Sequence, residues 1–354
     1  MENTQGDQQH DLPFSSTQQP KYSKGTISIA LVHEALASAK MQGVNTEQLL
    51  LQVGIPLELM NSSKTRVSVS VYAQLWIALA DLMNDEFFGM DRHPMRRGSY
   101  QLISRLVMHS ETVGQALKHI LQFFNSIFDD IHSELKIDQE GMLLILHDHH
   151  SIKPMFSYAT YLMLIHTLMC WLADQRILIE HIQLCCHAPI DDQDYRVRFC
   201  ENITYSAKQN QIRFDATCLN IKIKQDKQSW YQFMLHTPQN LLTRFKNPDA
   251  LSSRIRKHLM QVHPSQWLEL NALSQRLNMS EATVQRRLKH EGLSYQQLKN
   301  DIRRDTAIEF LTKTEKSIQA ISDELNFQDP SAFHRAFKKW TGVSPGTYRS
   351  SGEV

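Results

Sequence analysis

The sequence predicts an α+β N-terminal domain followed by an all-α C-terminal domain, in which two helix-turn-helix units are joined by a linker helix. Three observations lead to this fold class. Helical periodicity alternates with strand-like runs over the first two thirds of the chain, strand signals stop beyond Leu251, and the last hundred residues contain one helical pattern twice.

The length of the chain, 354 residues, exceeds what one hydrophobic core usually supports and indicates two domains. We expect a disordered tail over residues 1–25, a first domain over 26–235, a linker over 236–250 and a second domain over 251–350. The longest apolar stretch, Tyr158–Ala173, is shorter than the roughly 20 residues of a membrane span. With no secretory signal near Met1, we expect a cytoplasmic protein that does not enter a membrane.

Helices are predicted in the first domain wherever apolar residues recur at intervals of three and four. Val71, Leu75 and Leu79 illustrate the pattern, because they fall on one helical face together with Trp76. The same criterion predicts helices over Leu31–Met41, Glu47–Val53, Val71–Met83, Gly98–Val107, Val113–Phe128 and Met155–Trp171.

Strands are predicted where short apolar runs are separated by turn residues. Ile131–Ile137 and Gly141–His147 lie on either side of such a turn and predict a hairpin. Further strands are expected at Ile179–Cys186 and Gln211–Phe214. Together with the helices, these strands give the first domain its α+β character.

The C-terminal hundred residues contain an internal repeat with an offset of about 48 to 50 positions. Leu277 and Asn278 recur as Leu325 and Asn326. The wider set of matched pairs is Ala272 and Ala320, Ser274 and Ser322, Arg286 and Arg335, Lys289 and Lys338, Gly292 and Gly342, and Ser294 and Ser344. A repeated helix pair indicates one supersecondary unit used twice.

Each copy has the pattern of a helix-turn-helix. In the first, Leu270–Leu277 is a short helix, Asn278 and Met279 form the turn, and Ser280 caps a second helix with an inward face of Val284 and Leu288. In the second, Asp329 is the expected cap of the second helix and Pro330 its first residue. The expected inward stripe of this helix is Phe333, Phe337 and Trp340.

The segment between the two copies, Tyr295–Thr312, predicts a linker helix about 27 Å long. This length is close to the roughly 34 Å that separates successive major grooves on one face of DNA. From Ser252 onward the net charge is +5, whereas the preceding residues carry −4. A modest basic excess beside two helix-turn-helix patterns favours double-stranded DNA as a partner.

The C-terminal repeat resembles the DNA-binding domain of the AraC/XylS family of bacterial transcription regulators. The resemblance is carried by SIQAISDELNFQDPSAFHRAFKKWTGVSPGTYR, and two departures from the family pattern stand out. The glycine common in both turns is replaced by Asn278 and Asn326, and Ala282 stands where a larger side chain is usual. Asparagine tolerates the left-handed conformation, so we expect both turns to form.

The resemblance implies which side chains meet DNA. Base-reading contacts are expected from Ala282, Gln285 and Arg286 in the first unit and from Ser331, His334 and Arg335 in the second. Phosphate contacts are expected from Thr283, Lys289, Lys338 and Lys339.

Upstream, RVSVSVYAQLWIALADLMNDEFFGM, SETVGQALKHILQFF and HAPIDDQDYRVRF resemble the long N-terminal domain of the branch that includes ornithine-utilisation regulators. This resemblance implies a domain that senses a small-molecule effector and influences self-association into a homodimer. It also implies RNA polymerase as a partner. The effector, its binding residues, the operator and the sign of regulation stay open. The predicted helices Val71–Met83, Val113–Phe128 and Met155–Trp171 are the candidate walls of the effector pocket.

The sequence also permits three other interpretations, each with less support. His147 and His149 share one side of a strand and could hold a metal, but polar residues that follow a buried strand are the commoner explanation. Cys185, Cys186 and His187 form a cluster without the spacing of a tetrahedral zinc site. We therefore expect no metal and no cofactor, and the sequence leaves open whether either cluster binds a metal. An alkyltransferase needs an activated cysteine, and none of the five cysteines lies in such a motif, so we expect no enzyme. A non-specific architectural DNA binder would need a larger basic excess.

Overall fold

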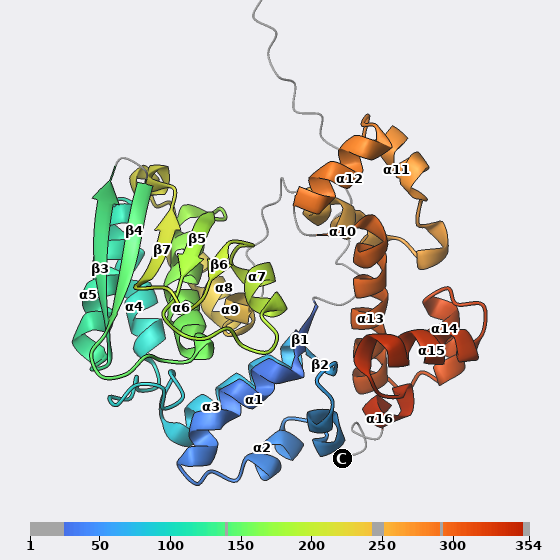
Figure 1. Cartoon of the computed structure of the whole chain (residues 1–354), viewed down its shortest axis with the longest axis horizontal. Helices are drawn as coiled ribbons and strands as arrows, with labels where there is room; N and C mark the ends of the chain where they lie inside the picture. Colours follow the sequence, from blue (N-terminus) through green and yellow to red (C-terminus); the bar gives the residue numbers. More distant parts are fainter. Residues whose placement is uncertain (1–24, 139–140, 243–250, 291–292, 350–354) are drawn as a thin grey trace, which may run out of the picture.

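The computed structural model describes residues 25–138, 141–242, 251–290 and 293–349 of the chain. Figure 1 shows an N-terminal part, residues 25–242, that holds a sheet, and a C-terminal part, residues 251–349, that is helical. Residues 1–24 of the expected tail and residues 243–250 of the expected linker lie outside the described residues.

The N-terminal part alternates helices and strands, as the fold class requires. Its elements are β1 (Thr26–Ser28), α1 (Ile29–Met41), α2 (Thr46–Gln52), η1 (Leu57–Asn61), β2 (Arg66–Ser68), α3 (Val69–Met83), α4 (Ser99–Val107), α5 (Val113–Ile127), β3 (Ile131–Asp138), β4 (Gly141–Asp148), α6 (Met155–Ala173), β5 (Ile179–Gln183), α7 (Gln193–Arg198), β6 (Ile203–Thr204), β7 (Asn210–Phe214), η2 (Ala216–Asn220), α8 (Lys227–Leu235) and α9 (Gln239–Leu242).

Five strands form one sheet in the order β3-β4-β7-β5-β6. The predicted hairpin is confirmed, because β3 and β4 pair antiparallel from Ile131 opposite Asp148 to Asp138 opposite Gly141. Strand β7 pairs antiparallel with β4 and β5, and β6 runs parallel to β5. Helix α5 packs along β3 and against α6 (Figure 1). The sheet and these two helices form the two layers of an α+β domain.

The strand predicted at Ile179–Cys186 is shorter in the structure and ends at Gln183. The N–H of Cys185 donates to the side chain of Asn210 at 2.7 Å, so the chain leaves the ladder there. A second, two-stranded sheet of β1 and β2 was not predicted. Each of its strands has three residues, which is too short to show an alternating pattern.

The predicted helices are present, with ends shifted by one or two residues. Helix α6 is long and apolar enough to cross a membrane by length and composition alone, but its residues from Met155 to Leu172 are all buried in the core. It is therefore the central helix of the N-terminal part. Residues 239–242, within the expected linker, form α9, which packs on α3 and α6 with Leu241 and Leu242 buried.

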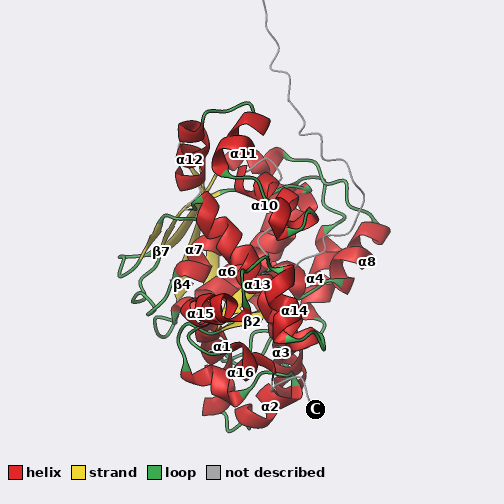
Figure 2. Cartoon of the chain, turned by 90° about the vertical axis from the view of Figure 1, so that its right-hand side faces the viewer, coloured by secondary structure: helices red, strands yellow, loops and turns green. Residues whose placement is uncertain are grey.

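The C-terminal part contains only helices within its described residues. They are α10 (Leu251–Gln261), η3 (Pro264–Gln266), α11 (Leu270–Arg276), α12 (Glu281–His290), α13 (Tyr295–Lys313), α14 (Ile318–Glu324), α15 (Pro330–Thr341) and α16 (Pro345–Arg349). Figure 2, seen from the side of these helices, shows α10–α12 above α13 and α14–α16 around its lower end.

Two hydrophobic cores divide the C-terminal part. The first helix-turn-helix packs with α10 and the beginning of α13 in a core of its own, which includes Val284, Leu288 and Leu298. The second packs in a core that is continuous with that of the N-terminal part, through Phe333, Phe337 and other residues of α14–α16. The second unit is thus joined to the N-terminal part more closely than the first.

Candidate functional site

The two helix-turn-helix units have the same turn geometry. Asn278 and Asn326 are both in the left-handed conformation, with φ of 52° and 57°. After each asparagine, a backbone N–H donates to the carbonyl of a buried serine at 3.0 Å, from Met279 to Ser274 and from Phe327 to Ser322. Both turns form without the usual glycine because the asparagine side chain is among the few that tolerate this conformation.

In the second unit, α15 begins at Pro330, directly after the predicted N-cap residue Asp329. The side chain of Asp329 accepts a hydrogen bond from the N–H of Ala332 at 2.7 Å. Phe333 and Phe337 are fully buried, as predicted, whereas Trp340 is only half-buried and packs at the edge of the core. The opposite faces of α15 are exposed and carry Ser331, His334, Arg335, Lys338 and Lys339.

In the first unit, α12 follows Ser280, whose hydroxyl accepts from the N–H of Thr283 at 3.2 Å. Val284 and Leu288 are buried as predicted. The exposed side chains of this helix include Ala282, Gln285, Arg286 and Lys289. Thr283 is half-buried, and its hydroxyl lies 2.9 Å from that of Ser280. Arg287, a further exposed cation on α12, was not among the expected contact residues, although its position directly after Arg286 is visible in the sequence.

Helix α13 connects the two units as a single helix from Tyr295 to Lys313, about 28 Å long (Figure 1). Apolar side chains along the helix are buried, among them Leu298, Ile302, Ala307 and Leu311. Arg303 adds a polar link, because its Nε donates to the carbonyl of Leu325 and its guanidinium lies 4.8 Å from the ring centre of Trp267. The helix is therefore fixed to both units.

The C-terminal part also contacts the N-terminal part through β2. The Tyr348 hydroxyl of α16 accepts from the backbone N–H of Arg66 at 3.1 Å and donates to the Arg66 carbonyl at 2.8 Å. A second contact comes from β1, the strand paired with β2, where the Thr26 hydroxyl donates to the Asp305 carboxylate of α13 at 2.7 Å. We call these hydrogen bonds the β2 contact.

Charges around Asp305 stabilise the β2 contact. Burial alone would raise the pKa of this carboxyl, but Arg304, Arg256 and Arg66 together hold it below its ordinary value. A carboxyl with a lowered pKa stabilises the fold above its ordinary pKa. The stabilisation is lost as the pH falls through the lowered value.

A cavity of about 500 Å³ lies between the two parts, beside the β2 contact. Its apolar wall comes from α3 and α6 and includes Trp76, Phe156 and Met163. The C-terminal part contributes residues of α10 and α13, among them Arg256 and Asp301. Its volume falls within the range of small-molecule sites.

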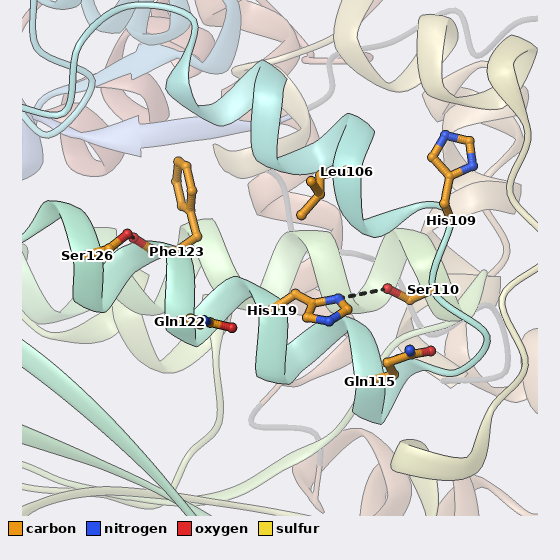
Figure 3. Close-up of a pocket in the computed structure, with 8 residues that line it drawn as sticks. All are labelled: Leu106, His109, Ser110, Gln115, His119, Gln122, Phe123 and Ser126. Atoms are coloured by element: carbon orange, nitrogen blue, oxygen red, sulfur yellow. Dashed lines mark hydrogen bonds between the residues drawn. The ribbon is translucent and has the colours of Figure 1, made fainter.

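A second, open pocket lies on the outer surface between α4 and α5 (Figure 3). It is lined by Leu106, His119, Phe123 and other side chains, and the Ser110 hydroxyl lies 3.3 Å from Nδ1 of His119. Of the three helices expected to form an effector pocket, α3 and α6 line the cavity between the parts, while α5 lines this outer pocket.

The histidine and cysteine clusters have other contacts. Nε2 of His147 lies 3.0 Å from the Glu134 carboxylate, and the ring of His149 stacks on His132. Across the described residues, three or more His, Cys, Asp or Glu side chains do not converge in a group suited to a metal ion. Burial raises the pKa of the Cys170 and Cys186 thiols to about 11, so both are protonated at neutral pH and are poor nucleophiles.

Two family models match the sequence. One, described as the arabinose-binding domain of AraC transcription regulators at the N-terminus, covers residues 43–223, and a helix-turn-helix domain model covers residues 273–351. The first match spans about half of the chain.

Two relatives and one solved structure also align with the chain. The chain is 21% identical over 335 residues to the ornithine utilization regulator of Pseudomonas aeruginosa, covering 92% of this chain and 96% of that protein. It is 36% identical over 102 residues to the transcriptional regulator VqsM of the same organism, covering 29% and 31% of the two chains. A crystal structure of the regulator CdpR, also from Pseudomonas aeruginosa, aligns over 90% of this chain and 98% of that one with 18% identity and a TM-score of 0.31.

Proposed function

We propose, from the premise that the chain belongs to the AraC family of transcription regulators, that it reads one asymmetric DNA site with both helix-turn-helix units and that a small-molecule effector controls this binding. The observation that carries the proposal is the matched pair of units, each with a capped second helix and exposed polar side chains, joined by one continuous helix. Because the units differ in sequence, the two halves of the site differ as well.

The base-reading residues in the proposal are Ala282, Gln285 and Arg286 on α12 and Ser331, His334 and Arg335 on α15. Their support is exposure on the face opposite the buried stripe of each helix, where a base edge can approach. Phosphate contact is assigned to Thr283, Lys289, Lys338 and Lys339. The three lysines are exposed, whereas Thr283 is half-buried and suits a contact at the helix start.

Effector control is assigned to the N-terminal part. In its support, this part matches the arabinose-binding domain model, and the cavity between the parts has the size of a ligand site. A ligand changes DNA affinity only if it binds the DNA-competent and incompetent states with different affinity. Self-association and contact with RNA polymerase belong to the same proposal.

Selection from random DNA tests the DNA half of the proposal. The full chain is incubated with a pool of random duplexes, and bound DNA is amplified over several rounds. The expected product is one non-palindromic sequence with two conserved segments about one helical turn apart. Enrichment of a single segment, or of no sequence, would contradict binding by both units.

A further inference from the structure

The cavity between the two parts contains a buried positive charge without a counter-ion. Five arginines line it, and four of them pair with aspartates: Arg66 with Asp194 at 2.7 Å, Arg196 with Asp192 at 2.7 Å, Arg256 with Asp305 at 4.0 Å, and Arg304 with Asp301 and Asp305 at 3.0 and 2.9 Å. Within the described residues, the fifth, Arg198, is in contact with no carboxylate.

The Arg198 guanidinium is held in place by neutral groups. Its Nε donates to the Leu241 carbonyl of α9 at 3.1 Å, and its Nη2 donates to the Thr167 hydroxyl of α6 at 2.8 Å. Its Nη1 is buried and has no hydrogen-bond partner among the described residues. The side chain is only 7% exposed, and burial lowers its pKa to about 10, so it stays charged at neutral pH.

A buried charge with an unused donor is costly unless an opposite charge comes to it. The guanidinium matches the planar, two-oxygen geometry of a carboxylate. Thr160, also fully buried, has a hydroxyl without a partner in the described part of the chain and lines the same cavity. Thr160 lies two turns from Thr167 along one face of α6, about 10 Å by helical rise.

The other side chains that α6 and α3 contribute to the wall are largely apolar, with Phe156, Ala159 and Met163 on α6 and Trp76 on α3. A diamino acid fits this lining poorly. Its ammonium groups would need carboxylate partners, but the four lining aspartates already pair with arginines, and the fifth acid, Glu201, is exposed. The lining selects one negative charge attached to an uncharged, mostly apolar body.

We propose that this cavity binds a small monocarboxylate with an apolar body, and that the carboxylate is held by Nη1 of Arg198. The inference rests on the proposed effector control and names the site and chemical class of the effector. Because α10 and α13 form one side of the cavity, the bound ligand contacts both parts of the chain. It therefore acts on the same junction as the β2 contact.

The test measures ligand binding to the full chain in the absence of DNA. The probes are hexanoate, decanoate and phenylbutanoate, each paired with the alcohol of the same carbon skeleton, and the readouts are titration calorimetry and melting temperature. We expect at least one carboxylate to bind about tenfold or more tightly than its alcohol and to raise the melting temperature with concentration. Equal binding of carboxylate and alcohol in every pair, or no binding at all, would overturn the proposal.

Substitutions test whether the charge that binds the carboxylate is that of Arg198. Arg198→Met removes the charge and keeps a long, unbranched side chain. It should weaken the binding of the carboxylate about 10- to 100-fold and leave the binding of the alcohol unaffected. Arg176→Met is the matched control, because Arg176 also donates to a backbone carbonyl, that of Phe199, but does not line the cavity. Thr160→Val should weaken the binding of the carboxylate a few fold. Carboxylate binding that is unchanged in Arg198→Met, or weakened equally in Arg176→Met, would refute the assignment to Arg198.

Titration of the selected DNA then separates this inference from effector control in general. A carboxylate that binds through Arg198 but leaves the affinity for DNA unchanged would support the binding site in the cavity. It would contradict effector control of DNA binding through that site. If the affinity for DNA responds to another small molecule, and that response is the same in Arg198→Met, effector control of DNA binding would be supported. The assignment of the effector site to Arg198 would then be wrong.

Discussion

Arg335 and Lys339 lie one turn apart on α15 and are both exposed, but we expect them to contribute differently to DNA binding. Arg335→Ala should cost about 1–3 kcal/mol on the selected site and relax preference at one base pair, because it removes a base contact. Lys339→Ala should weaken all sequences about equally, because phosphates carry no sequence information. Titration of each variant on the selected and a shuffled duplex checks both. An equal loss on the two duplexes for Arg335→Ala would contradict its base-reading role.

The turn asparagines allow a test of local conformation. Asn326→Ala should destabilise the second unit by about 1 kcal/mol, because alanine lacks the polar side chain that tolerates a φ of 57°. Asn326→Gly should cost little, since glycine adopts this conformation freely. The exchange rate of the Phe327 amide, which is bonded to the Ser322 carbonyl, reports local opening. Similar rates in the alanine and glycine variants would contradict the role given to the backbone conformation.

The sequence predicts those features of single residues that depend on their near neighbours in the chain. The cap at Asp329, the turns at Asn278 and Asn326 and the buried positions Val284 and Phe333 follow from spacing alone. The unpaired charge of Arg198 could not be predicted. Its partners come from α6 and α9, and the pairing of the other lining arginines is a property of the folded chain.

Helix α13 determines how the two units are placed relative to each other. Inserting two alanines after Arg303 would rotate one half of the helix by about 200° against the other and add about 3 Å. Ile302 belongs to the first core and Ala307 to the core shared with the N-terminal part, so the insertion separates the two. We expect specific DNA binding to be lost while binding to shuffled DNA persists. A footprint of unchanged length and affinity would show that the units are not coupled through α13.

Long elements were predictable because they repeat their pattern several times. The hairpin of β3 and β4 and the core helix α6 are examples. The strands β1, β2 and β6 have two or three residues each, too few for a period to appear, and they are defined by pairing with distant segments. The early end of β5 depends on Asn210, twenty-five residues away from Cys185.

The β2 contact joins the N-terminal and the C-terminal parts of the chain. Tyr348→Phe removes a hydroxyl that satisfies both the N–H and the carbonyl of Arg66, and we expect a loss of about 1–3 kcal/mol in the docking of the parts. Tyr231→Phe is the control, because that side chain is exposed, and it should change stability by less than about 0.5 kcal/mol. Denaturation of the two variants beside the unmodified chain measures both effects. Equal stability of the two variants would show that the β2 contact does not hold the parts together.

The division into a sheet-containing part and a helical part could be predicted from the change in pattern after Leu251. The way in which the parts meet could not. Thr26 and Asp305 are 279 positions apart, and Arg66 and Tyr348 are 282 apart, so nothing in the local sequence signals either contact. The cavity has the same origin, since its lining is assembled from both ends of the chain.

The most direct test of the regulator as a sequence-specific DNA-binding protein is the ratio of its affinities for the selected duplex and a shuffled duplex of the same composition, measured over a range of salt concentrations. Base-reading contacts from two units predict a ratio of about 1,000 or more near physiological salt, while the affinity for both duplexes falls as salt rises. A ratio near one at every salt concentration would mean that the chain binds the DNA backbone alone, and would contradict recognition by α12 and α15.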